Sequence, residues 1–398
     1  MSTAPSPAIV TSVTGLTPAR SLLIGVIGFL TLVDLFATQA ILPSLAAEYG
    51  VKPSEIGVAA NSTTLGMAIA GLLVGAISAN LEHKRAITLS LLVLSVPTAL
   101  LAFAPNLTLF ALLRVTQGLF MASAFTLTLT HLAERCQHRT ASALAAYVTG
   151  IVASNLVGRL TAALVAGAVG ASSSFLFFAA LNVAGAALAI FSLTRNEPQS
   201  MSGGERFWSA WASHLAEPAL RRTFAIGFLI LFGFIGVFTY VGFVLMRPPH
   251  ALSMGALGLV FLVFAPSMLT TPTAGRITSR FGPGLTVPAS LAVALLGLVL
   301  LLLPSLIALL AGMALVGIGT FFAQAVATGH VGRIAQGDRA AASGLYLSSY
   351  YCGGLFGAAA IGQLFDRFGW VVAIAGVFAA LGLAAVLGLK LRAPEEVV

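Results

Sequence analysis

The sequence predicts an all-helical integral membrane protein with twelve transmembrane helices, arranged as two similar six-helix halves. Of its 398 residues, 58% are hydrophobic and only 8% are charged, whereas a soluble domain carries about 25% charged residues. A water-soluble fold could not hide this much apolar surface, so the surrounding medium must be lipid. The chain also matches itself at a constant offset of half its length, which pairs Gly118 with Gly317 and His131 with His330.

Apolar runs define the predicted spans. About 12 of them are roughly 18–25 residues long, which is enough to cross a bilayer as a helix. The sequence lacks the short segments of alternating polarity that a membrane β-barrel needs. The predicted spans are 21–43, 56–79, 86–104, 107–130, 140–165, 172–194, 222–246, 255–275, 284–303, 305–328, 340–364 and 369–391.

Polar segments separate the predicted domains. Apart from the polar linker at residues 195–221, the connections between the predicted spans are only a few residues long. The sequence contains no phosphate-binding Gly-Lys-Ser/Thr loop. We therefore expect neither an enzyme nor a cofactor-binding protein, and ATP is not the expected energy source. The expected domains are a disordered N-terminal tail (1–20), an N-terminal six-helix bundle (21–194), a cytoplasmic linker with room for an interfacial helix (195–221), a C-terminal six-helix bundle (222–391) and a C-terminal tail (392–398).

The formal charge of +8 reflects topology rather than nucleic-acid binding. With the N-terminus in the cytoplasm, only Lys52, Arg247 and Arg367 fall outside, while Arg114 and Arg159 fall within spans. All other lysines and arginines lie inside, as the positive-inside rule requires. We expect a multi-pass protein of the inner (cytoplasmic) membrane with both termini in the cytoplasm. The sequence shows no metal-ligand cluster, so no metal site is expected.

Two cytoplasmic loops at repeat-related positions combine small and basic residues. The resulting pattern resembles the Gly-x-x-x-Asp-Arg-x-Gly-Arg-Lys/Arg loop found in each half of the major facilitator superfamily. In the first loop, Asn80 stands where that family has Asp. The resemblance implies that these loops take part in gating. Their candidate gating residues are Asn80, Lys84, Arg85, Gly275, Ser279 and Arg280.

A second pattern, from Arg114 to Gly118, resembles the Arg-x-x-Gln-Gly signature of the drug/proton antiporters in that family, and the chain also resembles a related efflux-permease branch. The resemblance implies the major facilitator fold, with spans one, four, seven and ten lining the central path. Small residues spaced four apart form flat helix faces for close packing. The expected helix-packing glycines are Gly118, Gly150, Gly158, Gly353 and Gly357.

Ionisable residues within membrane spans are costly and are therefore functional candidates. Asp34, Arg114 and Arg159 fall in one layer of the first half, and the second half has Gly233, Met313 and Ala358 at the matching positions. We expect the three charges to form one cluster. It serves either proton coupling and substrate contact or a permanent ion pair that fixes the helices. The surplus positive charge would also suit an anionic substrate.

Other polar and aromatic residues on the spans that line the path are candidates for the substrate site. Their mixture suits an amphipathic organic molecule better than a polyol. The candidate substrate-binding residues are Gln39, Gln117, Met121, Asn155, Phe232, Phe238, Tyr240, Phe321, Gln324, Tyr346 and Tyr350.

The sequence thus predicts a secondary active transporter that works by alternating access and exports a small amphipathic organic compound in exchange for protons. We expect it to act as a monomer in the lipid bilayer, with no nucleic-acid partner. An organic-anion transporter or exchanger with an arginine clamp is the alternative. A membrane sensor or assembly factor without transport activity is a remote alternative.

Overall fold

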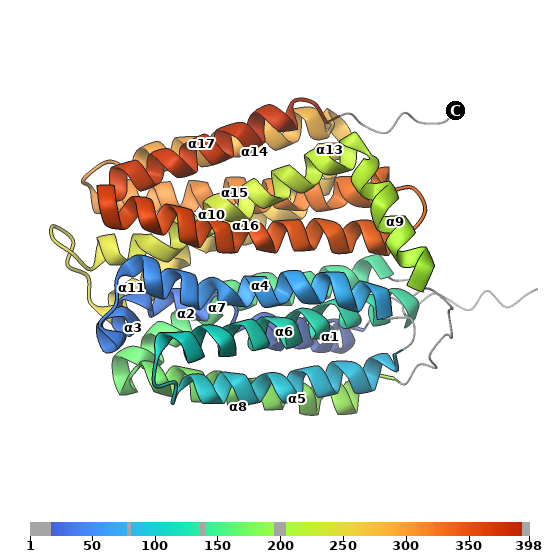
Figure 1. The fold of residues 1–398 in the computed structure, drawn as a ribbon, viewed down its shortest axis with the longest axis horizontal. Helices are drawn as coiled ribbons and strands as arrows, with labels where there is room; N and C mark the ends of the chain where they lie inside the picture. The colour runs from blue at the N-terminus through green and yellow to red at the C-terminus, as the bar shows by residue number, and fades with distance from the viewer. Residues whose placement is uncertain (1–16, 78–80, 136–139, 195–203, 392–398) are drawn as a thin grey trace, which may run out of the picture.

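A computed structural model of the chain describes residues 17–77, 81–135, 140–194 and 204–391 (Figure 1). The first half is an all-helical bundle, drawn in blue and green. Its first predicted span is divided into short helices, and the other five spans are continuous helices. These elements are α1 (Pro18–Leu32), α2 (Ala37–Ala40), α3 (Leu42–Tyr49), α4 (Pro53–Ile77), α5 (His83–Leu101), α6 (Leu107–Arg135), α7 (Thr140–Val169) and α8 (Ala171–Ser192).

The second half forms a matching bundle, drawn in yellow to red (Figure 1). One helix of the predicted linker, α9 (Gly204–Ala216), precedes it, and its second span is divided. The elements of this half are α10 (Pro218–Leu245), α11 (Met254–Val260), η2 (Phe261–Phe264), α12 (Ala265–Thr270), η3 (Thr271–Thr273), α13 (Ala274–Phe281), α14 (Pro283–Leu300), α15 (Leu306–Ile334), α16 (Arg339–Phe368) and α17 (Trp370–Gly388).

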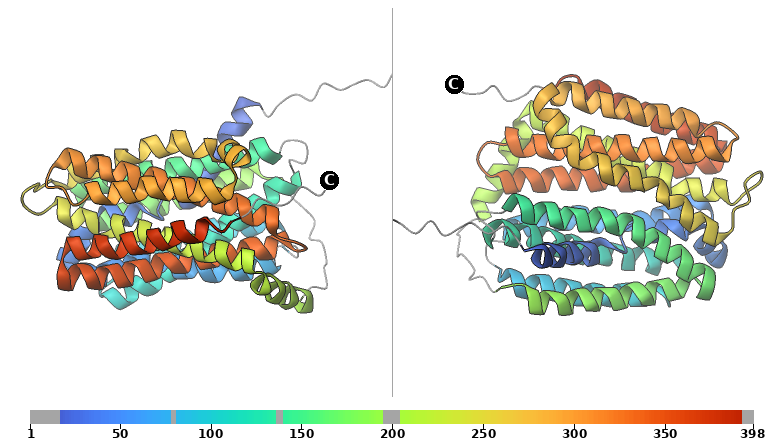
Figure 2. Two further views of the ribbon diagram at one scale, coloured as in Figure 1. Left: turned by 90° about the horizontal axis from the view of Figure 1, so that it is seen from above. Right: turned by 180° about the vertical axis from the view of Figure 1, so that it is seen from behind.

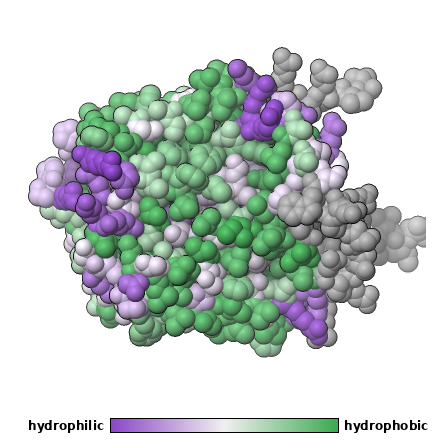
Figure 3. Space-filling model, in the orientation of Figure 1, coloured by the Kyte–Doolittle hydropathy of each residue, from purple (hydrophilic) through white to green (hydrophobic). Residues whose placement is uncertain are grey.

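The predicted membrane fold is confirmed. Within the described residues, ten helices or helical runs are long and apolar enough to cross a bilayer. The first span, divided between α1 and α2, and the serine- and tyrosine-containing α16 complete the twelve. Large apolar side chains such as Leu73, Phe191 and Phe356 remain exposed on the outer surface of the bundles. Figure 3 shows this apolar surface over the middle of one face, with hydrophilic residues toward its ends.

Two predicted spans are not the continuous helices that the sequence indicated. The first stops at Leu32, turns through residues 33–36 and resumes as α2. The eighth changes to a 3-10 helix at Phe261–Phe264, directly before Pro266. Proline has no N–H group and clashes with the preceding turn, which explains the second irregularity. The first has no proline and depends on side-chain partners that come from other helices.

Close packing within each half brings backbones together at glycines. A Cβ atom on Gly158 would lie 2.2 Å from the carbonyl oxygen of Val33, directly beside the break in the first span. Helix α7 can approach the break only because this residue has no side chain. The other predicted packing glycines also face a neighbouring backbone: Gly118 on α4, Gly150 on α1, and Gly353 and Gly357 on α10.

The two halves meet along two seams. In the first, Ser348 Oγ of α16 donates to the Ala68 carbonyl of α4 at 2.7 Å. In the second, Gly258 of α11 lies against Ala163 of α7. The linker helix α9 is fixed to the second half, because His214 Nε2 donates to the Asp338 carbonyl at 2.8 Å. Figure 2 shows the two bundles from two further sides.

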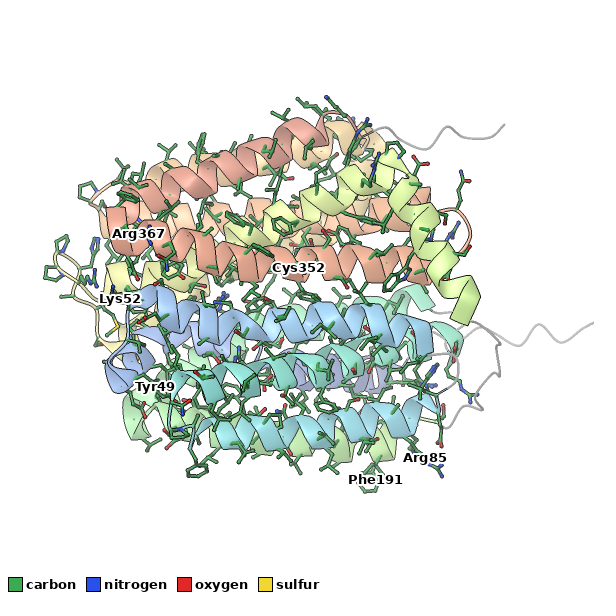
Figure 4. The ribbon with its side chains drawn as sticks, in the orientation of Figure 1. Tyr49, Lys52, Arg85, Phe191, Cys352 and Arg367 are labelled. Carbon is green, nitrogen blue, oxygen red and sulfur yellow. The ribbon has the colours of Figure 1, made fainter. Side chains whose placement is uncertain are left out.

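One end of the molecule carries Lys52 and Arg367 (Figure 4), two residues that the sequence predicts to lie on the outside. We call it the outer end. There the backbone N–H of Ser54 donates to Asp366 Oδ2 at 3.2 Å. This bond places a carboxylate from α16 at the N-terminus of α4, where the helix dipole favours negative charge. The contact joins the two halves at the outer end.

Candidate functional site

The break in the first span holds Asp34, whose side chain is 2% exposed. Its Oδ2 atom accepts hydrogen bonds from Gln117 Nε2 at 2.7 Å and Asn182 Nδ2 at 3.2 Å. The Thr98 hydroxyl also lies 3.3 Å away, although its closer acceptor is the Leu94 carbonyl at 2.7 Å. Three helices, α5, α6 and α8, therefore surround the carboxylate with neutral groups. Asp34 Oδ1 has no hydrogen-bond partner.

Arg114 holds the broken backbone in place. Its Nη2 donates to the Leu35 carbonyl at 3.1 Å, and its Nε donates to the Ala60 carbonyl of α4 at 2.9 Å. Its Nη1 donates to Gln117 Oε1. Because a membrane supplies no water, a carbonyl freed by a helix break needs such a partner. Arg114 reaches Asp34 through the side-chain amide of Gln117.

Arg159 lies in a second site at the boundary between the halves, where its side chain is 0% exposed. Its Nη2 donates to Gln39 Oε1 at 2.5 Å, whereas Nε and Nη1 have no acceptor in the described part of the chain. Five phenylalanine rings surround the guanidinium carbon, at centroid distances of 4.4–5.6 Å. We call this group the phenylalanine cage; it consists of Phe36, Phe234, Phe238, Phe261 and Phe264.

A chain of polar side chains extends from Arg159 across the boundary. Gln39 Nε2 donates to Asn61 Oδ1 at 3.2 Å, and Asn61 Nδ2 donates to Thr239 Oγ1 at 3.1 Å. These residues belong to α2, α4 and α10, so the chain links both halves. A movement of the halves against each other would break it between Asn61 and Thr239.

The three charges of the predicted cluster are not joined by direct ion pairs in the structure, and their joint role stays a prediction. Among the described residues, neither Arg114 nor Arg159 lies within 4.0 Å of the Asp34 carboxylate as an ion pair. Arg114 and Asp34 share one network through Gln117, whereas Arg159 faces the opposite half. Helix depth alone suggested one layer. It did not show that α7 turns Arg159 toward α10 and η2.

Comparison with known proteins places this arrangement in a family. The family model of the Major Facilitator Superfamily matches residues 24–248 and 245–398, which together take in nearly the whole chain. The chain belongs to the Major Facilitator Superfamily.

Individual relatives agree with this membership. The facilitator is 28% identical over 379 residues to the "Inner membrane transport protein YnfM" of Escherichia coli (strain K12), a match that covers 92% of this chain and 88% of that protein. It is 26% identical over 379 residues to the "Uncharacterized MFS-type transporter YybF" of Bacillus subtilis (strain 168), covering 93% of each. These relatives are named as transporters, and the facilitator is a multi-pass membrane protein rather than an enzyme.

A solved structure shows the same fold. It is the crystal structure of a bacterial homologue of the human lysosomal transporter Spinster, in an inward-facing and occupied conformation. The TM-score is 0.73 at 15% sequence identity, and the match covers 95% of this chain and 99% of that chain. The twelve-span facilitator fold in two six-helix bundles is therefore shown.

The other predicted substrate-binding residues lie in several different environments in the structure. Phe238 belongs to the phenylalanine cage, and Phe321 packs against the cage residue Phe234 at 5.1 Å between ring centroids. Asn155 lies one turn before Arg159 on α7, with its Oδ1 unpartnered. Met121 is fully buried in the core.

Further predicted residues lie away from the cage. The Tyr346 hydroxyl donates to Gln324 Oε1 at 2.8 Å, and Tyr350 stacks on Tyr346. The Tyr240 hydroxyl donates to the Ala358 carbonyl at 2.5 Å, so Tyr240 joins α10 to α16. Phe232 stacks on Phe228 of the same helix.

The predicted gating residues lie at the end of the molecule opposite Lys52. Arg85 Nε pairs with Glu82 Oε2 at 2.8 Å, within its own half, and Lys84 is its neighbour on α5. On α13, Ser279 Oγ donates to the Arg276 carbonyl, Arg280 lies over the Phe281 ring, and Gly275 has open space around it. Asn80 lies outside the described residues.

Sequence reasoning missed several residues of both sites. Asn182 and Thr98 are polar residues within largely apolar stretches of α8 and α5, and their polarity was a detectable signal. The rings of Phe36, Phe261 and Phe264 gave no such signal, because phenylalanine is also common on lipid-facing surfaces. In the described part of the chain, no group of three His, Cys, Asp or Glu side chains is placed to hold a metal ion.

Proposed function

We propose that this facilitator is a secondary active transporter that exports a small amphipathic organic compound in exchange for protons, with Asp34 as the proton-exchanging group. The observation that carries the proposal is the environment of Asp34: a buried carboxylate that receives hydrogen bonds from neutral amides and, among the described residues, forms no ion pair. An ionised carboxylate in such a place is costly, so binding a proton relieves that cost.

The position of Asp34 supports coupling between proton and substrate. Asp34 and Gln39 belong to the same irregular segment between α1 and α3. Gln39 bonds to Arg159 at the boundary between the halves. A change in the hydrogen bonds of Asp34 can therefore shift the segment that positions the boundary site. The resemblance of Arg114–Gly118 to the drug/proton antiporters agrees with this role, because both Arg114 and Gln117 contact the break.

We further propose that the transporter acts as a monomer in a cytoplasmic membrane, with both termini on the cytoplasmic side. The placement of Lys52, Arg247 and Arg367 together at one end supports this orientation. Alternating access then consists of rocking of the two halves about the seams between them.

The proposal is tested with the purified chain in proteoliposomes under an imposed proton gradient. Ethidium and 1-naphthoate serve as probes of opposite charge, and protein-free liposomes correct for passive permeation. Asp34→Asn is expected to abolish gradient-driven movement of the transported probe and to preserve its counterflow exchange. Glu55→Gln, an exposed acid-to-amide change, is the matched control and is expected to behave like the wild type. Gradient-driven transport that survives Asp34→Asn would contradict the proton-exchange role.

The arginine-clamp alternative is favoured by one specific observation, the unpartnered guanidinium of Arg159. It concerns the identity of the transported compound rather than the coupling.

A further inference from the structure

Arg159 has the features of an anion-binding site for which the described part of the protein supplies no anion. A guanidinium carries five N–H donors, and the Nε and Nη1 nitrogens, which hold three of them, have no acceptor among the residues that the structure describes. The side chain is 0% exposed, so these donors do not face bulk solvent. No carboxylate lies within 4.0 Å of it among the described residues. Arg114, the other buried arginine, in contrast has an acceptor for each of its three nitrogens.

If Arg159 had only a structural role, we would expect an ion-pair or hydrogen-bond partner to offset the cost of burying its charge. Burial of a charge without a partner costs several kcal/mol, and a surrounding ring contributes only about 0.5–2 kcal/mol through a cation–π contact. The phenylalanine cage partly offsets the free-energy cost of burying the guanidinium in this conformation. It does not supply acceptors for the guanidinium N–H groups. That capacity is matched by an anion with oxygen acceptors.

We propose that Arg159 binds the carboxylate of an aromatic organic acid, and that this class of monoanion is the transported compound. The proposal rests on the proposed transport function and names the substrate class. The cage argues for an aromatic body, since its walls are phenylalanine rings, which pack edge-to-face or offset against another ring. It also argues against a small hydrated anion, which would need further polar donors to replace its water.

Two broken spans build this site. In the first, Phe36 ends the break at residues 33–36 and Gln39 follows it on α2. In the eighth, the 3-10 turn aligns Phe261 with Phe264, because residues three apart eclipse in such a helix. Their rings are parallel to within 5°, and both lie over the guanidinium. Irregular backbone inside a membrane protein is tolerated where it lines a binding cavity, and transporters place substrates at such breaks.

The site is formed by residues of both halves, so separation of the halves would open it to a ligand. Arg159, Gln39 and Phe36 belong to the first half, whereas the other four cage rings belong to the second. When the halves separate, the guanidinium loses those four rings. A ligand ring can take their place while its carboxylate accepts from the free N–H groups. The unpartnered Asn155 Oδ1, one turn away on α7, offers an acceptor to a ligand hydroxyl.

The test is equilibrium binding of radiolabelled 1-naphthoate to the purified full-length protein in detergent, with neutral 1-naphthamide as the isosteric competitor. We expect the wild type to bind the carboxylate and to discriminate against the amide. Arg159→Met is expected to weaken carboxylate binding roughly 100-fold, since two charge-assisted hydrogen bonds are lost. Arg159→Lys is expected to retain partial binding. Arg367→Met, at the exposed outer end, is the matched control and is expected to bind like the wild type.

Other variants and the wild type itself keep the proposal falsifiable. Phe264→Leu removes the ring nearest the guanidinium and is expected to weaken naphthoate more than it weakens cyclohexanecarboxylate. If Arg159→Met does not fold, Phe264→Leu and the carboxylate–amide discrimination of the wild type decide the question. Equal binding of acid and amide by the wild type, or unchanged naphthoate binding by folded Arg159→Met, overturns the proposal. Gradient-driven transport by Asp34→Asn tests proton coupling, whereas naphthoate binding by Arg159→Met and the acid–amide discrimination of the wild type test substrate class, so the two claims can fail separately.

Discussion

Gln117 connects the two charged groups of the first-half site. Its amide nitrogen donates to Asp34 Oδ2, and its amide oxygen accepts from Arg114 Nη1. An amide can do both at once, which a carboxylate or an ammonium cannot. Asp34 and Arg114 therefore share a network without forming a direct ion pair, so the proposed proton exchange at Asp34 would not require Arg114 to leave.

Gln117→Leu is predicted to destabilise the transporter by about 3 kcal/mol, because it removes one hydrogen bond from each of two buried charged groups, Asp34 and Arg114. Denaturant titration of the protein in detergent measures this effect. The control is Thr116→Val, an exposed neighbour on the same helix, which is expected to change stability little. Equal stability of the two variants would show that the network does not hold the site.

Residue chemistry was only partly predictable from the sequence. Charged residues inside spans are rare, so Asp34, Arg114 and Arg159 could be identified directly. Their partners could not, because the partners depend on which helices are neighbours and how each is rotated. The placement of Arg159 apart from Asp34 follows from the rotation of α7, and hydropathy contains no information about that rotation.

Among the elements, the contact between α7 and the break in the first span sets the geometry of both sites. Gly158 lets α7 lie against Val33, the residue before Asp34, and places Arg159 at the boundary between the halves. The break itself was not predictable, since residues 33–36 contain neither glycine nor proline. The irregular eighth span had a visible signal in Pro266 and Pro272, although that signal does not specify which side chains become aligned.

Gly158→Ala is predicted to push α7 away from the break. The new Cβ atom would lie 2.2 Å from a backbone oxygen, which cannot move like a flexible side chain. We expect a loss of about 1–3 kcal/mol of stability, the usual cost of overpacking, with lower transport activity. Gly329→Ala, in a helix with open space at that position, is the control and is expected to be neutral or slightly stabilising. A melting temperature in detergent that is the same for both variants would contradict this account.

At the scale of the whole molecule, the seam between α4 and α16 joins the halves over most of its length. Ser54 and Asp366 meet at the outer end, while Ala68 and Ser348 meet deeper in the membrane. The architecture of two six-helix bundles could be predicted from composition, span count and internal repeat. The contact between Ser54 and Asp366 could not, since these residues are far apart in sequence.

Alternating access is the central claim. The hydrogen bond between Ser54 and Asp366 at the outer end provides a direct way to test it. A cysteine at position 239, buried on α10 between the halves, is introduced into a chain whose Cys136 and Cys352 are replaced by alanine. Its reaction with a membrane-impermeant maleimide is measured from each side of oriented proteoliposomes. Asp366→Asn is then added to weaken the cap on α4, and Glu55→Gln at the same end is the control.

We predict that Asp366→Asn raises the labelling rate from the outer side about fivefold, the factor that corresponds to the loss of about 1 kcal/mol of helix capping. It should lower the rate from the opposite side, because opening one entrance of an alternating-access transporter closes the other. Labelling that increases from both sides, or that stays the same from both, would contradict the central claim.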